Sequence, residues 1–233
     1  MRAKYPTDLT DAEWDIVRKF IPEPVWHRNL TEPKHQRRDI LDAIFYRERT
    51  GCQWRNLPHD FPPWKQVFEY YRNWRNDGTI EELHDALRAR VREATPHADG
   101  TSRTDAPTVC ILDSQSAKTT EEGEQARGYD AGKKVKGRKR HLVVDALGLL
   151  LALRVTTASM QDRDAALPMF KEVKRAFPSL QVAFADGAYR GEIKTRIEEE
   201  TKMRLQISLR SDVQKKDSSP SQSAGSSSAP LVG

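Results

Sequence analysis

The chain has 233 residues, and 39 Lys and Arg against 34 Asp and Glu give a formal net charge of +5. This length can bury a core without disulfide support, and the two cysteines lack the paired spacing of a zinc cluster or a disulfide framework. The sequence holds no apolar run of about 18 to 20 residues and no apolar signal-peptide core, so neither a membrane span nor export is expected. We therefore expect a cytoplasmic protein whose modest basic excess agrees with a polyanionic partner.

The first 94 residues predict a helical domain, which contains all five tryptophans. Thr10 and Glu13 form a capping box in front of the first helix, Gly51 follows the second, and Thr79 begins the fourth with a further capping signal. The predicted helices cover, in order, 11–20, 36–49, 62–76 and 79–93.

The third predicted helix carries both aromatic and basic residues. Its aromatics repeat at the spacing of a buried helix face, which favours a core role over base stacking: Trp64, Phe68, Tyr71 and Trp74. The helix follows a short turn, in the manner of a helix-turn-helix. Arg72 and Arg75 are therefore candidate DNA contacts.

The periodicity changes after residues 95–107, a polar segment with the Pro, Gly and Ser content of a linker. We predict a strand at 109–113, two strands within 140–157 folded about Leu147-Gly148, a helix at 164–176, a strand at 181–185, a helix at 191–201 and a strand at 204–208. Strands and helices in this order predict an α/β fold with a mixed sheet. The Ser-rich tail is too polar to fold, so we predict disorder there.

Two aspartates follow apolar strands of this second part. Asp113 ends the first predicted strand, and Asp186 comes directly after another. Two carboxylates on neighbouring strands could hold Mg²⁺ or Mn²⁺ against phosphate oxygens. The alternative is that each Asp only begins a turn or caps the next element, and spacing alone does not decide between the two interpretations.

A basic run lies between the two aspartates. Residues 127–140 contain seven Lys and Arg and a single acid, Asp130. Beside a metal site, this run would neutralise the DNA backbone and release counterions. A solvated loop without a partner and a nuclear-localisation segment are the alternatives. The candidate DNA-binding residues of the run are Lys133, Lys134, Lys136, Arg138, Lys139 and Arg140.

Several stretches resemble successive blocks of the insertion-sequence DDE transposases, in the insertion-sequence five group. They include LTDAEWDIVRKFIP, DAIFYRERTGCQWRNLPHD, ILDSQSAKT, GKKVKGRKRHLVVDALGLLLALRVTTASMQDRDAA and FADGAYRG, and the resemblance covers about residues 8–212. It implies an RNase H-like catalytic domain behind a small all-α N-terminal domain. It also implies that Asp113 and Asp186 are the first two acids of an Asp-Asp-Glu triad that uses Mg²⁺ to cut and join DNA.

This resemblance completes the expected organisation of the chain. The expected partners are the terminal inverted repeats of an insertion sequence and target DNA, bound by a homo-oligomer. The expected parts are a helical DNA-binding domain at 1–94, a linker at 95–107, an incomplete RNase H-like catalytic domain at 108–212 and a disordered tail at 213–233.

The third acid of the family pattern is absent. The family carries its glutamate on a later helix, in a segment like RWVVERTFAW, and no such segment occurs here. A one-nucleotide change of frame at Lys215-Lys216, with permitted codons, allows the tail to be read as KGFVALPKRWVVERTFGW. We hypothesise a frameshift site at these lysines, which sequencing of the gene can refute. A truncated DNA-binding regulator or inhibitor of transposition is therefore the alternative to an active enzyme, and a stand-alone nuclease is a third interpretation.

Overall fold

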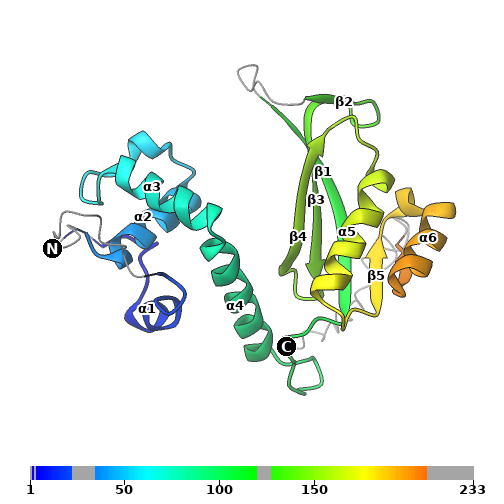
Figure 1. Cartoon of the computed structure of the whole chain (residues 1–233), viewed down its shortest axis with the longest axis horizontal. Helices are drawn as coiled ribbons and strands as arrows, with labels where there is room; N and C mark the ends of the chain where they lie inside the picture. The colour runs from blue at the N-terminus through cyan, green and yellow to red at the C-terminus, as the bar shows by residue number, and fades with distance from the viewer. Residues whose placement is uncertain (1, 3, 23–34, 120–126, 209–233) are drawn as a thin grey trace, which may run out of the picture. The chain divides into compact units, whose positions relative to one another are not determined.

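The computed structural model describes residues 2, 4–22, 35–119 and 127–208, and the predicted disordered tail lies outside them. The chain forms two compact units, Met1–Arg103 and Thr104–Gly233 (Figure 1). Their division falls inside the polar segment 95–107. Over the described ranges, no helix combines the length and the apolar character needed to cross a membrane.

The N-terminal unit is helical. Its described elements are α1 (Asp11–Val17), α2 (Arg37–Thr50), the 3-10 turn η1 (Trp54–Asn56), α3 (Trp64–Asn76) and α4 (Thr79–Ala94). The predicted capping box is present, since Glu13 N donates to Thr10 Oγ1 at 3.2 Å and Thr10 N donates to Glu13 Oε2 at 2.8 Å. Gly51 ends α2 in the left-handed conformation, with φ 69°. These local signals confirm that side-chain and glycine caps set the helix ends.

Two helix ends differ from the prediction. The first helix stops at Val17 rather than residue 20, because Phe20 N bonds to Val17 O at 3.0 Å and closes a tight turn. Thr79 is not the cap of α4: Gly78 is, with φ 88°, and the Thr79 N–H donates to Asp77 Oδ1 at 3.0 Å. The cap therefore lies one residue earlier, where glycine accommodates the positive φ.

The core of this unit lies between the helices. Val17, Ile40, Val67 and Trp74 are buried in one cluster. Phe68 departs from the predicted buried face: it is 37% exposed, and its ring packs edge-on against Trp54 at 5.4 Å. The aromatic stripe of α3 thus divides between the core and the surface.

The second unit is a mixed sheet with helices. Its described elements are β1 (Val109–Lys118), β2 (Gly128–Asp130), β3 (Val135–Asp145), β4 (Leu150–Thr157), α5 (Asp162–Ala176), β5 (Val182–Ala185), η2 (Gly187–Tyr189), α6 (Glu192–Thr201) and β6 (Arg204–Ile207). β1 pairs antiparallel with β3 and parallel with β5, β5 pairs parallel with β6, and β4 and β2 pair with successive stretches of β3. The order β4-β3-β1-β5-β6 is that of an RNase H-like sheet, which confirms the expected fold class.

Two strands extend beyond their apolar parts. β1 continues to Lys118 instead of ending at residue 113, and β3 begins at Val135 rather than 140. These polar halves pair with each other, as in the register Ser116↔Lys139. A strand ladder uses backbone groups, which polar residues supply as well as apolar ones. Most of the basic run is therefore strand, and the alternative of a solvated loop is wrong for residues 135–140.

The two faces of the sheet have different surroundings. On one face, Cys110, Leu112 and Val143 pack with residues of α5 and α6 in one buried core. On the opposite face, alternate residues belong to no buried cluster, and Ile111 and Val155 are 39% and 51% exposed. We call these the helix-covered face and the open face of the sheet. Side chains alternate along a strand, so each residue of β1 and β3 is assigned to one face.

Candidate active site

Asp113 and Asp186 lie side by side in the register of two parallel strands. Ile111 of β1 is the partner of Phe184 of β5, and each aspartate is two residues further along its own strand direction. Asp186 keeps an extended backbone, with φ −77° and ψ −179°. Asp113 lies in the middle of β1 rather than at its end, on the open face. The fold therefore brings together the two acids that the sequence singled out.

Each aspartate makes one local hydrogen bond. Asp113 Oδ1 accepts from Ser114 N at 2.7 Å, and Asp186 Oδ1 accepts from Ala188 N at 2.9 Å. The second bond caps η2, so the turn-capping interpretation holds for one oxygen of Asp186. Within the described chain, the other oxygen of each carboxylate has no hydrogen bond or ion pair. Both side chains are exposed, so these oxygens face solvent.

Two exposed carboxylates fit Mg²⁺ as part of a ligand set, because Mg²⁺ prefers oxygen ligands and is commonly held by one or two carboxylates together with substrate phosphates. In the part of the chain that the structure describes, no three His, Cys, Asp or Glu side chains are grouped so as to hold a metal ion. The pair therefore supplies two ligands, and no third protein acid joins it among these residues.

Because side chains alternate along a strand, the basic residues of β3 lie on two different faces of the sheet. Arg140 is the partner of Gln115 and Arg138 is the partner of Ala117, which places both on the face that holds Asp113. Lys136 lies two residues before Arg138 on the same strand and therefore shares this face. Lys136 and Arg140 are exposed, and Arg138 is half-buried. These cations form a row on β3 that begins at Arg140, opposite Gln115, which is two residues after Asp113.

Lys139 lies on the helix-covered face and is 4% exposed. Its Nζ pairs with Asp162 Oδ1 at 3.0 Å and Asp130 Oδ2 at 3.4 Å, and donates to Met160 O at 2.9 Å. A hydrogen bond from Ser116 at 2.7 Å, with further contributions from Lys133 N and Lys139, lowers the pKa of Asp130 to about 2. Lys139 therefore joins β2, β3 and the start of α5, and its charge is neutralised inside the unit.

The remaining basic candidates lie elsewhere. Lys133 and Lys134 are exposed in the turn between β2 and β3, where Lys133 Nζ donates to Ser114 O at 3.1 Å. Arg72 and Arg75 are exposed on α3, one helical turn apart. These two arginines belong to the N-terminal unit, whereas the two aspartates belong to the second unit.

Tyr189 is a residue near this site that the sequence did not single out. Its side chain is 1% exposed, and its hydroxyl is buried. Burial, together with the charges of Asp162 and Asp186, raises the pKa of Tyr189 well above its ordinary value. The ring belongs to the core under α5, so it anchors η2 directly behind Asp186. Its aromatic character within an otherwise polar turn was the available signal.

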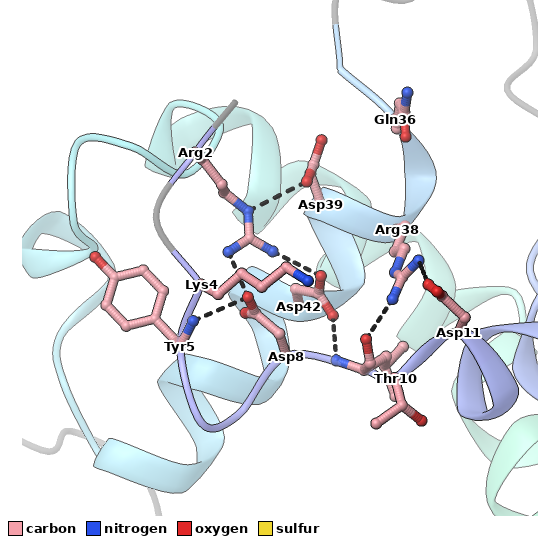
Figure 2. A pocket seen from close by; sticks show the side chains of 11 residues that line it. Arg2, Lys4, Tyr5, Asp8, Thr10, Asp11, Gln36, Arg38, Asp39 and Asp42 are labelled. Atoms are coloured by element: carbon pink, nitrogen blue, oxygen red, sulfur yellow. Dashed lines mark hydrogen bonds and ion pairs between the residues drawn. The ribbon is translucent and has the colours of Figure 1, made fainter.

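A second group of carboxylates lies in the N-terminal unit and lines a pocket of about 620 Å³. Figure 2 shows Arg2 between three acids, with distances of 2.8 Å to Asp8, 3.2 Å to Asp39 and 2.6 Å to Asp42. Asp42 also accepts from Leu9 N at 2.9 Å. Since each of these acids is already paired, the cluster ties the N-terminal segment to α2 and offers no vacant ligand set.

Comparison with known families separates the same two parts of the chain. A family model described as a transposase of the IS4/5 family matches residues 9–84. A second model, described as a transposase DDE domain, matches residues 104–230.

Two curated relatives match over a shorter stretch. The y4sN protein of Sinorhizobium fredii is 30% identical over 86 residues, which are 37% of this chain and 65% of that protein. A 16.2 kDa protein of insertion element IS402 from Burkholderia cepacia is 27% identical over 90 residues, 37% of this chain and 61% of that protein. The chain thus spans less than two thirds of the length of either relative.

Among solved structures, the HTLV-2 integrase catalytic core with magnesium is 15% identical, with a TM-score of 0.30, over 48% of this chain and 66% of that one. The piggyBac transposase synaptic complex is 12% identical, with a TM-score of 0.35, over 86% of this chain and 48% of that one. Scores this low add nothing to the fold assignment, which rests on the strand order. The match to the DDE-domain model covers more than half of the 233 residues, so the chain belongs to the DDE transposase family.

Proposed function

We propose that this chain is the DNA-binding and metal-binding part of an insertion-sequence transposase. The main support for this proposal is the register of β1 and β5. Asp113 and Asp186 each lie two residues beyond the paired Ile111 and Phe184, both are exposed, and neither has a cation paired to it among the described residues. Their expected substrate is the phosphodiester backbone at the terminal inverted repeats of the element, bound by a homo-oligomer.

The two aspartates would hold Mg²⁺ or Mn²⁺. When bound, the metal would supply activation of water, and later of a 3′ hydroxyl, for in-line attack on a DNA phosphodiester. The chain's own contribution is to fix the two carboxylates at one level of the sheet, where Tyr189 anchors the turn that carries Asp186. Two neighbouring rigid strands hold ligands more precisely than mobile loops do.

The DNA backbone would run along the cationic row of β3. Lys136, Arg138 and Arg140 share the open face with Asp113, and their spacing of two residues repeats about every 6 to 7 Å along a strand. Binding there would neutralise phosphates and release counterions next to the acids. Lys133 and Lys134 would extend the row through the adjoining turn, and Arg72 and Arg75 would contact DNA from the helical unit.

The third acid would come from an element that covers the open face. Ile111, Leu153 and Val155 are 39%, 52% and 51% exposed there, and an apolar sheet surface is stabilised when another element buries it. The described residues provide no third ligand for the aspartate pair. We therefore propose that this chain alone binds DNA but does not complete the cutting reaction.

The two-acid ligand set among the described residues favours a second function: a regulator that occupies element ends, or joins copies that carry a third acid, and so limits transposition. The regulator and the enzyme share the DNA-binding surface and differ only in cutting.

A cleavage assay distinguishes the two functions. The substrate is duplex DNA carrying the ends of the parent element, with Mg²⁺. This chain is compared with a version that carries the C-terminus read in the alternative frame, each with an Asp113→Ala control. We expect both proteins to bind and only the extended one to cut. Cutting by both, abolished by Asp113→Ala, would show that an acid within the 233 residues completes the site. Failure of both to bind would refute the DNA-binding proposal.

A further inference from the structure

A small pocket adjoins the turn that carries Asp186. It has a volume of about 240 Å³ and is formed by the start of α5, the residue after η2 and the first half of α6. Its lining is mostly charged and consists of Arg163, Asp164, Arg190, Glu192, Ile193 and Arg196. None of these residues belongs to the basic run on β3 or to the aspartate pair.

Arg190 places this pocket close to Asp186. It directly follows η2, and a methyl group added at Gly187 would lie 3.9 Å from Arg190 Nε. Its guanidinium therefore lies beside the residue that follows Asp186. Tyr189, buried under α5, holds the backbone of this turn in place.

The arginines of the pocket are available for a ligand. Over the described ranges, Arg163 and Arg190 make no ion pair, and Arg196 has one long contact, 3.7 Å to Glu200. The two acids of the lining, Asp164 and Glu192, are likewise in no ion pair there. All three arginines are exposed, and they line one concave surface together with two carboxylates. Guanidinium groups match phosphate oxygens in a bidentate geometry and are weakly hydrated.

We propose that Arg163, Arg190 and Arg196 bind a DNA backbone phosphate next to the phosphodiester held at Asp113 and Asp186. This inference rests on the proposed function and adds a second phosphate-binding site to it. In strand order, the cationic row of β3 lies on one side of β1 and the pocket follows β5 on the other. The row lies on the open face and the pocket on the side of α5 and α6, so the pocket reaches the acids through the turn that follows Asp186.

The test is duplex DNA binding, measured by fluorescence anisotropy over a series of salt concentrations. Arg163→Gln and Arg190→Gln are each compared with Arg175→Gln, an exposed arginine near the end of α5 outside the pocket. Loss of one phosphate contact lowers the slope of log affinity against log salt by about 1. We expect this loss for each pocket variant, partial retention by Arg190→Lys, and no change for Arg175→Gln. Circular dichroism checks that the variants are folded.

Two further arms separate the possible failures. If wild type and Arg175→Gln bind DNA, and Arg140→Gln weakens binding while both pocket variants match wild type, the pocket assignment is overturned and the proposed function stands. If wild type binds no duplex, the proposed function and this inference both fail. Inorganic phosphate is also compared with chloride at equal ionic strength. Phosphate binding, measured by calorimetry and lost in Arg190→Gln, with DNA binding unchanged by phosphate and by the substitution, would assign the pocket to free phosphate instead of DNA.

Discussion

Two groups of carboxylates in this protein show that the number of nearby acids does not identify a metal site. In the N-terminal unit, Asp8, Asp39 and Asp42 surround Arg2 (Figure 2). In the sheet, only two aspartates meet, and neither has a cation partner in the described part of the chain. The paired cluster can hold the fold together, whereas the unpaired acids remain free to hold an ion.

The difference follows from burial. Asp42 is 2% exposed, and burial raises its pKa despite the Leu9 N–H and the Arg2 guanidinium. Those two partners offset only part of the cost of removing its charge from water. Asp113 is exposed and makes one bond to its own neighbour, so it has no such cost to offset. Its remaining oxygen can bind a cation without breaking an existing contact.

The largest expected effect is on the paired cluster. Asp42→Ala should lower the free energy of unfolding of the N-terminal unit by about 3 kcal/mol, since it leaves the Leu9 N–H without its acceptor and removes the most buried of the three acids that pair with Arg2. All five tryptophans lie in this unit, so tryptophan fluorescence during urea unfolding measures it selectively. Asp39→Ala is the control, with a side chain 37% exposed and an expected loss of about 1 kcal/mol or less. Equal losses for the two variants would contradict this account.

Lys139 and Arg140 extend the comparison to two adjacent cations on opposite faces of β3. Lys139→Gln leaves Asp130 and Asp162 without their buried partner and should cost about 2 to 3 kcal/mol. Arg140→Gln changes an exposed side chain, so it should alter stability by no more than about 0.5 kcal/mol. It should instead lower the salt slope of DNA binding by about 1. Urea unfolding followed by circular dichroism, together with anisotropy, checks both. If Lys139→Gln instead changed DNA binding and Arg140→Gln changed stability, the assignment of these two residues to opposite faces of β3 would be wrong.

Asp130 is a third kind of carboxylate, which accepts hydrogen bonds but lies close to the surface. Its pKa is about 2 in the folded chain, below the ordinary 3.8, so its ionised form stabilises the fold above about pH 4. Asp130→Asn should therefore cost about 2 kcal/mol at pH 7. That difference should shrink as the pH falls from about 4 toward 2, because wild type then becomes protonated too. Urea unfolding of both proteins at pH 7, 4 and 3 measures the change, and a difference independent of pH would exclude this role for the carboxylate.

The sequence predicted those parts of the fold in which buried apolar residues repeat at a regular spacing. The helices and the apolar halves of β1 and β3 carry such a signal, as do the caps at Thr10 and Gly51. The polar halves of β1 and β3 and the short β2 do not, because backbone pairing holds them in the sheet. The burial of Lys139 follows only once the start of β3 is known, since a shift of one residue moves every side chain to the other face.

The two acids of the site were predictable from the sequence, whereas the residues around them were not. Asp113 and Asp186 each follow apolar strand residues, a pattern visible in one dimension. The two aspartates lie at the same level of the sheet because of the register between β1 and β5, which the sequence alone does not specify. The pocket of Arg163, Arg190 and Arg196 draws on three separate elements, so no local motif marks it.

The most direct test of the aspartate pair is Mn²⁺ binding, measured from the electron paramagnetic resonance signal of the free ion. Wild type is compared with Asp113→Asn, Asp186→Asn and a matched exposed control, Asp105→Asn. Each site variant should weaken Mn²⁺ binding by at least about tenfold, because affinity follows the number of charged ligands. Stability should change by no more than about 0.5 kcal/mol, because both side chains are exposed. Loss of binding in both site variants but not in the control is the predicted result. Unchanged Mn²⁺ binding in either site variant would contradict a shared metal site at Asp113 and Asp186.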